Sequence, residues 1–354
     1  MEFINVAYIT KFGTLHGAEI KSTGRFFFVA PSSPYVVDGR SYDASDDNDG
    51  ESPERAVATV SRAYELAEIS RGGSAVSNAK DTIVLLPGTH TLTSLLRIDT
   101  AGVTITGLPN TVSMENGYAS QTDTILTTSA SQHLLSIEAS NVTIGNLTLR
   151  PITGFIAVVF RNNPTVDNLR FKNVVVDMHT PAASANTGGI DFGYRANSST
   201  ALHGSWSTKG NAAAAVIATA YLENVTFMSR DSQGRALEQA TACLTLKNVW
   251  FKHTGVGTWA TPYMVATNSV TSVAENLRFT TSGTLTTNIS AATAGSVTST
   301  LVINKSLFSA TTTTGSPVCY AAANVVRISE GFQPDRRHTL GFMVSVVSVT
   351  GDGL

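Results

Sequence analysis

The acidic side chains best placed to do chemistry fall within residues 177–238. They are Asp177, Asp191, Asp231 and Glu238. Cleavage of a glycosidic bond uses two carboxyl groups about 5–10 Å apart, one as the acid and the other as base or nucleophile. In a stacked fold, two such groups would come from neighbouring coils. These four residues are therefore the acid candidates if the protein is an enzyme, although isolated acids at turns are usually solvated, so catalysis is the weaker hypothesis.

A second acidic cluster lies in the stretch SYDASDDNDGESPERAVATV, residues 41–60. Its aspartates could supply oxygen ligands to calcium. The register fails, however, because with Ser45, Asp47 and Asp49 as the first three ligands the twelfth position is Ala56 rather than a bidentate glutamate. Asp, Asn and Gly also favour consecutive turns. We therefore expect a turn that leads into a helix.

Composition excludes several classes of function. Charged residues are only 14% of the chain, the net charge is −2 and no basic stripe is present, so nucleic acid is not an expected partner. No apolar run approaches the ~20 residues of a membrane span, which argues against a membrane partner. The histidines lack metal-ligand spacing, and we predict no metal and no cofactor. The N-terminal residues do not resemble a signal peptide, which predicts assembly in a cytoplasm.

One short pattern recurs along the chain: an apolar residue, any residue, Asn, Leu or Val, any residue, then Phe or Leu. Its copies surround Asn146, Asn168, Asn224, Asn248 and Asn276, with a degraded copy at Asn304. Each copy is typical of a strand that bends at the asparagine, because Asn tolerates the left-handed region and the apolar positions keep one inward face. The gap of 56 residues between Asn168 and Asn224 predicts a diverged copy within 177–215.

Units of 22–28 residues cannot bury an apolar face alone, so they must stack. The spacing favours an all-β, single-stranded right-handed parallel β-helix over a β-sandwich with a chance repeat. Before the first coils, TVSRAYELAEIS places Val60, Ala63, Tyr64 and Ala67 on one helical stripe, with Thr59 as a plausible N-cap. We expect this helix to cap the solenoid.

The run DASDDNDGESPERAVATVSRAYELA, followed by DTIVLLPGTH, resembles the opening of right-handed parallel β-helix proteins of the pectate-lyase-like superfamily. The likeness is strong over residues 36–110 and extends weakly to about residue 310. Together with STGRFFFV before it, the segment resembles β-helix proteins carried in tailed-bacteriophage virions more than secreted lyases. The paired Asp, GHG-like and Arg/Lys motifs of the lyases and polygalacturonases are missing, which puts an inherited activity in doubt.

The predicted organisation has four parts: an N-terminal arm or attachment segment at 1–35, a turn, capping helix and first coils at 36–110, β-helix coils at 111–315, and an extended C-terminal segment at 316–354. The two ends supply the attachment candidates. Phe26, Phe27 and Phe28 could dock on a partner, or could form a strand packed on the first coil. Arg336 and Arg337 precede a C-terminal strand pattern that could pair with a neighbouring subunit.

These features favour two functions over a third, a secreted pectate-lyase-like enzyme, which the missing signal and motifs oppose. The first is a non-enzymatic structural protein of a tailed-phage virion, a decoration or cement protein on the outer head surface. It would form a homotrimer and bind the major capsid protein or tail proteins. The second is a tailspike or tail-fibre module that binds or cleaves host polysaccharide. In that case Trp206, Trp250 and Trp259 could stack on sugars, although bulky side chains at such positions more often pack internally.

Overall fold

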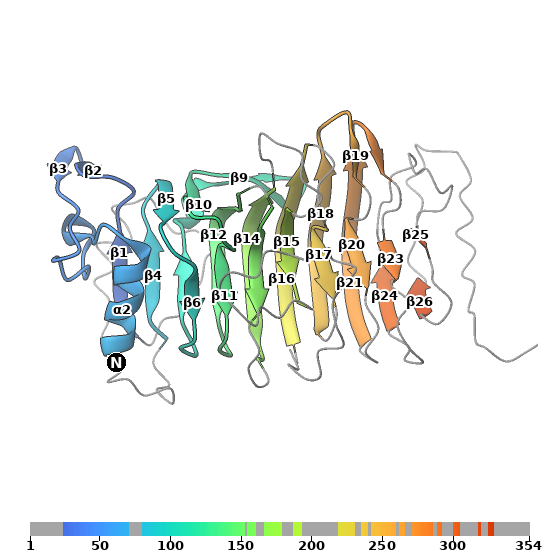
Figure 1. Ribbon diagram of the computed structural model, residues 1–354, viewed down its shortest axis with the longest axis horizontal. Coiled ribbons are helices and arrows are strands. Elements are labelled where there is room, and N and C mark those ends of the chain that lie inside the picture. Colours follow the sequence, from blue (N-terminus) through green and yellow to red (C-terminus); the bar gives the residue numbers. More distant parts are fainter. Residues whose placement is uncertain are drawn as a thin grey trace, which may run out of the picture.

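The computed structural model describes residues 24–70, 80–152, 154–160, 166–178, 187–192, 219–230, 235–239, 242–259, 262–265, 271–285, 289–291, 300–304, 318–319 and 325–328. Two parallel sheets run through the described coils, and within each sheet the strands lie side by side (Figure 1). Each coil contributes a strand to one sheet and then to the other. The predicted fold class, an all-β right-handed parallel β-helix with an N-terminal capping helix, is confirmed.

The larger sheet has twelve strands. In spatial order its main path is β1 (Phe26–Val29), β4 (Thr82–Leu85), β7 (Thr104–Thr106), β12 (Thr143–Arg150), β14 (Leu169–Asp177), β16 (Thr219–Ser229), β18 (Cys243–His253), β21 (Thr271–Thr281), β24 (Thr300–Asn304) and β26 (Val325–Ile328). Two further strands, β10 (Thr124–Thr128) and β5 (Gly88–Leu92), continue from the second half of β12. All these pairings are parallel, as a solenoid requires.

The smaller sheet has eight strands. Its order is β6 (Leu96–Ile98), β11 (Leu135–Ile137), β13 (Ile156–Phe160), β15 (Gly188–Asp191), β17 (Leu237–Gln239), β20 (Tyr263–Val265), β23 (Ile289–Ala291) and β25 (Val318–Cys319). Short pairs complete the strands: β2 (Tyr35–Val37) with β3 (Arg40–Tyr42), β8 (Val112–Glu115) with β9 (Tyr118–Thr122), and β19 (Thr258–Trp259) with β22 (Thr284–Leu285). Single 3₁₀ turns occupy Pro53–Arg55 and Pro109–Thr111.

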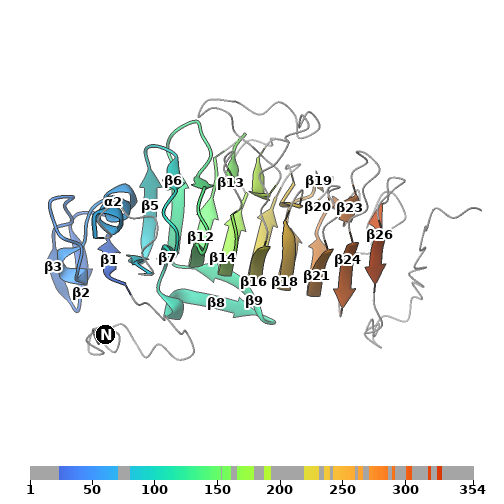
Figure 2. The ribbon, with the colours of Figure 1, turned by 90° about the horizontal axis from the view of Figure 1, so that it is seen from below.

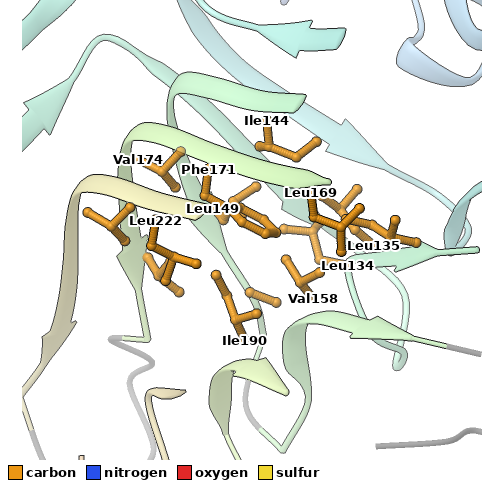
Figure 3. Close-up of a cluster of buried hydrophobic side chains, with 14 of the residues drawn as sticks. Leu134, Leu135, Ile144, Leu149, Val158, Leu169, Phe171, Val174, Ile190 and Leu222 are labelled. Atoms are coloured by element: carbon orange, nitrogen blue, oxygen red, sulfur yellow. The ribbon is translucent and has the colours of Figure 1, made fainter. Parts of the chain in front are cut away.

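Apolar side chains from both sheets fill the space between them. Figure 3 shows Ile144, Phe171 and Leu222 from the larger sheet meeting Leu135, Val158 and Ile190 from the smaller one. Further along the axis, Phe227, Phe251 and Phe279 stack in register, with ring centroids 5.3 and 4.6 Å apart. Because each coil presents the same inward positions, apolar residues stack directly on apolar residues of the next coil.

The long strands of the larger sheet bend at asparagines in the left-handed conformation, as the sequence predicts. Their φ angles lie between 54° and 60° at Asn146, Asn173, Asn224, Asn248 and Asn276. The prediction misplaced one copy. Asn173, not Asn168, aligns with Asn146, because Leu147 pairs with Val174 across β12 and β14.

The expected diverged copy within 177–215 is also wrong. Strand β14 pairs directly with β16, so Asn173 and Asn224 belong to adjacent coils although 51 positions separate them. The long spacing is an insertion within one coil, not an extra coil in this sheet. The degraded copy at Asn304 is out of register by one residue, since Asn304 pairs with Glu275.

The N-terminal end is closed by α2 (Val60–Ser70), which lies against β1 and β4 (Figure 1). The four residues predicted for its inner face, Val60, Ala63, Tyr64 and Ala67, are its buried residues. Thr59 is the N-cap, because its Oγ1 accepts a hydrogen bond from the backbone N–H of Arg62 at 3.1 Å. The capping helix therefore forms where the sequence placed it.

Candidate functional site

Two of the predicted acids lie side by side in the smaller sheet. Strands β15 and β17 pair so that Asp191 is opposite Glu238, while Ile190 and Leu237 form the inward pair in the core. Neighbouring strands are about 4.8 Å apart, and successive side chains point to opposite faces. The two carboxylates therefore stand on adjacent coils, on the outward side of the sheet.

Both carboxylates are shielded from solvent. Asp191 is 0% exposed and Glu238 is 2% exposed. Arg235 donates from Nη1 to Oε2 of Glu238 at 2.7 Å, three residues earlier on the same coil. Buried carboxylates are tolerated when they are ion-paired and hydrogen-bonded. Among the described residues this pair is therefore a buried site on two adjacent coils, with Glu238 ion-paired to Arg235.

Of the other two acid candidates, Asp177 lies in the larger sheet, away from this pair. Asp177 ends β14 in the larger sheet, where its Oδ2 accepts a hydrogen bond from Nε of Arg150 at 3.0 Å. Asp231 lies outside the described residues. Among the residues that the structure describes, no group of three or more His, Cys, Asp or Glu side chains could hold a metal ion.

The aspartate cluster at 43–49 is a turn and a helix cap, as expected. Asp46 Oδ1 accepts hydrogen bonds from the backbone N–H groups of Ala58 and Thr59, at 3.0 and 2.9 Å, and its Oδ2 accepts from the Thr59 hydroxyl at 2.9 Å. Asp49 accepts from the N–H of Glu51 and pairs with Arg55 at 2.9 Å. These carboxylates are engaged by the backbone that leads into α2.

The attachment candidates fall in two places. Phe26–Phe28 belong to β1, which pairs with β4 in the first coil, and Phe27 is 2% exposed within the core. Of the two alternatives for this segment, the strand packed on the first coil is the one that forms. Phe26 and Phe28 are half-buried, and an attachment role for them stays a prediction. Arg336 and Arg337 lie outside the described residues.

A ladder of asparagine side chains, which the sequence pattern alone did not predict, runs along the outer side of the bends. The side-chain amide of each asparagine donates to Oδ1 of the one in the preceding coil, at 2.8–2.9 Å, through Asn173, Asn224, Asn248 and Asn276. Asn146 begins the series by donating to Thr106 Oγ1 at 2.9 Å. A second, single pair joins Asn168 to Asn141 at 2.7 Å.

The β8–β9 hairpin lies across these coils like a strap, along the direction of the solenoid axis (Figure 2). It explains the burial of an outward row just past the bends, which includes Thr148, Thr226 and Trp250. Tyr118, at the start of β9, donates its hydroxyl to Asn276 Oδ1 at 2.8 Å and packs on Trp250 with ring centroids 5.7 Å apart. Burial raises the pKa of the Tyr118 hydroxyl, which keeps it a donor.

Two cations lie over the Trp250 ring, near Tyr118. The guanidinium of Arg278 is 4.6 Å from the ring centroid, and the ammonium of Lys252 is 4.2 Å from it. Lys252 also pairs with Glu115 of the hairpin at 3.4 Å. Trp250 is therefore enclosed rather than presented to a sugar, Trp259 is fully buried, and Trp206 lies outside the described residues.

Comparison with known proteins gave neither a matching family model nor a match among curated proteins. Solved structures similar to this chain include a pectin methylesterase from Aspergillus niger (TM-score 0.48, 13% identity, covering 79% of this chain and 83% of that one) and PemA from Erwinia chrysanthemi (0.41, 10%, 87% and 92%). A rice weevil pectin methylesterase is a third (0.34, 12%, 84% and 92%). The assignment of the β-helix rests on the strand pairing described above. Among the described residues no helix is long and apolar enough to cross a membrane.

Proposed function

We propose that this protein is a non-enzymatic structural component of a tailed-phage virion, a decoration or cement protein on the outer surface of the head. The observation that carries the non-enzymatic part is the burial of Asp191 and Glu238, at 0% and 2% exposure, with Glu238 held by Arg235. A hydrolase needs its two carboxyl groups within reach of a substrate. A buried, ion-paired cluster suits a fixed scaffold instead.

The virion part of the proposal rests on the sequence resemblance of STGRFFFV and the segment that follows it, to residue 110, to β-helix proteins carried by tailed phages. The asparagine ladder adds support, because side-chain hydrogen bonds that link five successive coils suit a stiff, protease-resistant part. A homotrimer on the threefold positions of the shell, bound to the major capsid protein, is the arrangement proposed. Assembly would take place in the host cytoplasm.

Imaging of purified particles with a labelled antibody against this protein tests the proposal. Label on the faces of the head is the expected result. Label confined to the tail vertex, or particles that carry none of this protein, would overturn it.

A tailspike or tail-fibre module that cleaves host polysaccharide is the second candidate. It is favoured by one observation, the placement of Asp191 directly opposite Glu238 on neighbouring coils. The test is release of reducing ends from surface polysaccharide of the host. Activity that falls by about 10²-fold or more in Asp191→Asn and Glu238→Gln, with the fold retained, would favour this candidate. No release by the unaltered protein would exclude cleavage.

A further inference from the structure

An exposed part of the larger sheet carries charges in a repeating order. Before their bends, strands β14, β16, β18 and β21 present two outward rows, which we name the charged facet: Arg170, Tyr221, Thr245 and Val273 in one row, and Lys172, Glu223, Lys247 and Glu275 in the other. Each residue is paired in register with the next in its row. The facet is a flat patch of solvent-facing side chains four coils wide.

The facet is open to solvent, unlike the strap-covered row past the bends. Tyr221 and Val273, both apolar, are 42% and 43% exposed, and the remaining side chains are exposed or half-exposed. Within the chain Glu223 lies 3.6 Å from Lys172 and 3.8 Å from Lys247. Exposed ion pairs of this kind contribute little to folding stability. Folding stability alone therefore does not explain why positive and negative residues alternate along the second row.

The order of the charges is self-complementary. Along the second row it is positive, negative, positive, negative, and the preceding coil carries the uncharged Thr143 and Gly145 at the same register positions. Read in the reverse coil order, the same row is negative, positive, negative, positive, so each charge then lies opposite one of the other sign. A second copy rotated about a twofold axis parallel to the strands therefore places Lys172 against Glu275 and Glu223 against Lys247, with both contacts occurring twice.

The other face-to-face arrangement is unfavourable. A twofold axis that runs along the second row, parallel to the solenoid, keeps the coil order, so Lys172 would meet its own copy and Glu223 would meet its own copy. Like charges placed opposite each other repel. We infer that the charged facet is a contact between two copies of this chain, packed face to face with their coils running in opposite directions.

This inference goes beyond the proposed function and does not depend on it. In the favoured arrangement the Tyr221 ring, over which the Arg170 guanidinium lies at 5.6 Å, would face Thr245 of the second copy. The contact buries two half-exposed apolar side chains from each copy within a polar rim.

Two charge-reversed variants of the full chain test the pairing. Glu223→Lys with Glu275→Lys makes the facet positive, and Lys172→Glu with Lys247→Glu makes it negative. In low salt, sedimentation analysis should give the unaltered protein twice the mass of either variant alone. Mixing the two variants should restore the doubled mass in a species that contains one copy of each, distinguished by tags of different size.

The matched control is Glu51→Lys with Glu65→Lys, which makes the same charge change at exposed positions outside the facet and should keep the doubled mass. If the facet charges acted only within one chain, the two variants would not form a species that contains one copy of each. Equal masses for the unaltered protein and both variants, or no mixed species, would overturn the inference. If a variant does not fold, the salt dependence of the unaltered protein tests the pairing. Its mass should fall to half at 1 M salt, because the Debye length is then about 3 Å. An unchanged mass would overturn the pairing.

Discussion

Asn173 donates its side-chain amide to Oδ1 of Asn146 at 2.9 Å, although 27 positions separate the two residues. Each asparagine has both a donor and an acceptor, so the same contact passes from coil to coil as far as Asn276. The ladder fixes which residue of one coil lies beside which residue of the next. A slip of one residue would break every rung and turn the apolar face outward.

Asn224 lies in the middle of the ladder and has φ of 57°. We expect Asn224→Ala to lower the free energy of unfolding by about 2–5 kcal/mol. Two hydrogen bonds of about 0.5–1.5 kcal/mol each are lost, and alanine in the left-handed region costs about 1–2 kcal/mol. Chemical denaturation followed by circular dichroism measures the change.

Asn224→Gly separates the two causes, since glycine adopts positive φ without strain but makes no rung. This variant should be more stable than Asn224→Ala by about 1 kcal/mol and less stable than the unaltered protein. A glycine variant as stable as the unaltered protein would show that the rungs contribute nothing.

The strap depends on Tyr118, which joins its tip to Asn276 and Trp250. Tyr118→Phe keeps the ring and removes one hydrogen bond, worth about 0.5–1.5 kcal/mol. Amide hydrogen exchange at residues 112–122 should therefore be about two- to tenfold faster. Exchange in β16 and β18 should stay unchanged.

Tyr118→Ala removes the ring as well and should release the hairpin from Trp250. The expected sign is a shift of tryptophan fluorescence to longer wavelength, because Trp250 is then exposed to water. A hairpin that keeps its full protection in the alanine variant would contradict the role given to Tyr118.

His90 makes stability depend on pH. It is 4% exposed and donates from Nε2 to the carbonyl of Leu86 at 2.8 Å, and burial lowers its pKa below the usual value. The unfolded chain therefore binds a proton at a pH where the folded chain does not, so stability is present above about pH 6.5 and falls as the pH drops below it.

His90→Gln removes this titration. Between about pH 7.5 and about pH 5.5, the unaltered protein should lose more unfolding free energy than the variant, as measured by urea denaturation at each pH. The same loss in both proteins would assign the pH dependence to other groups.

The sequence predicts much of this fold because the information is local. The inward positions around Asn248 and Asn276 repeat, and the stripe from Val60 to Ala67 has helical spacing, so strand, bend and helix are all visible. Register is not local. FKNVVV around Asn173 lies only five residues from the better match at Asn168, and spacing alone cannot distinguish an inserted loop from an additional coil.

The candidate site shows the same limit. Sequence alone proposes Asp191 and Glu238 as acids from neighbouring coils, and the strand register brings them together. Their burial could not be foreseen, because it depends on what covers the sheet. The strap is similar: Asn116–Gly117 is a strong hairpin signal, and both residues have positive φ, but nothing in residues 112–122 indicates that Tyr118 reaches Asn276.

The aspartate cluster offers a closing test with a matched control. The Asp46 carboxylate accepts three hydrogen bonds from Ala58 and Thr59. At the adjacent Asp47 the backbone N–H, rather than the carboxylate, makes a hydrogen bond, which it donates to Ser45 Oγ. Asp46→Ala should lower the free energy of unfolding by about 1–2 kcal/mol, as expected for loss of a helix-capping carboxylate. Asp47→Ala should change it by less than about 0.5 kcal/mol. Equal effects of the two substitutions would mean that net charge, rather than the position of the Asp46 carboxylate, accounts for the cluster.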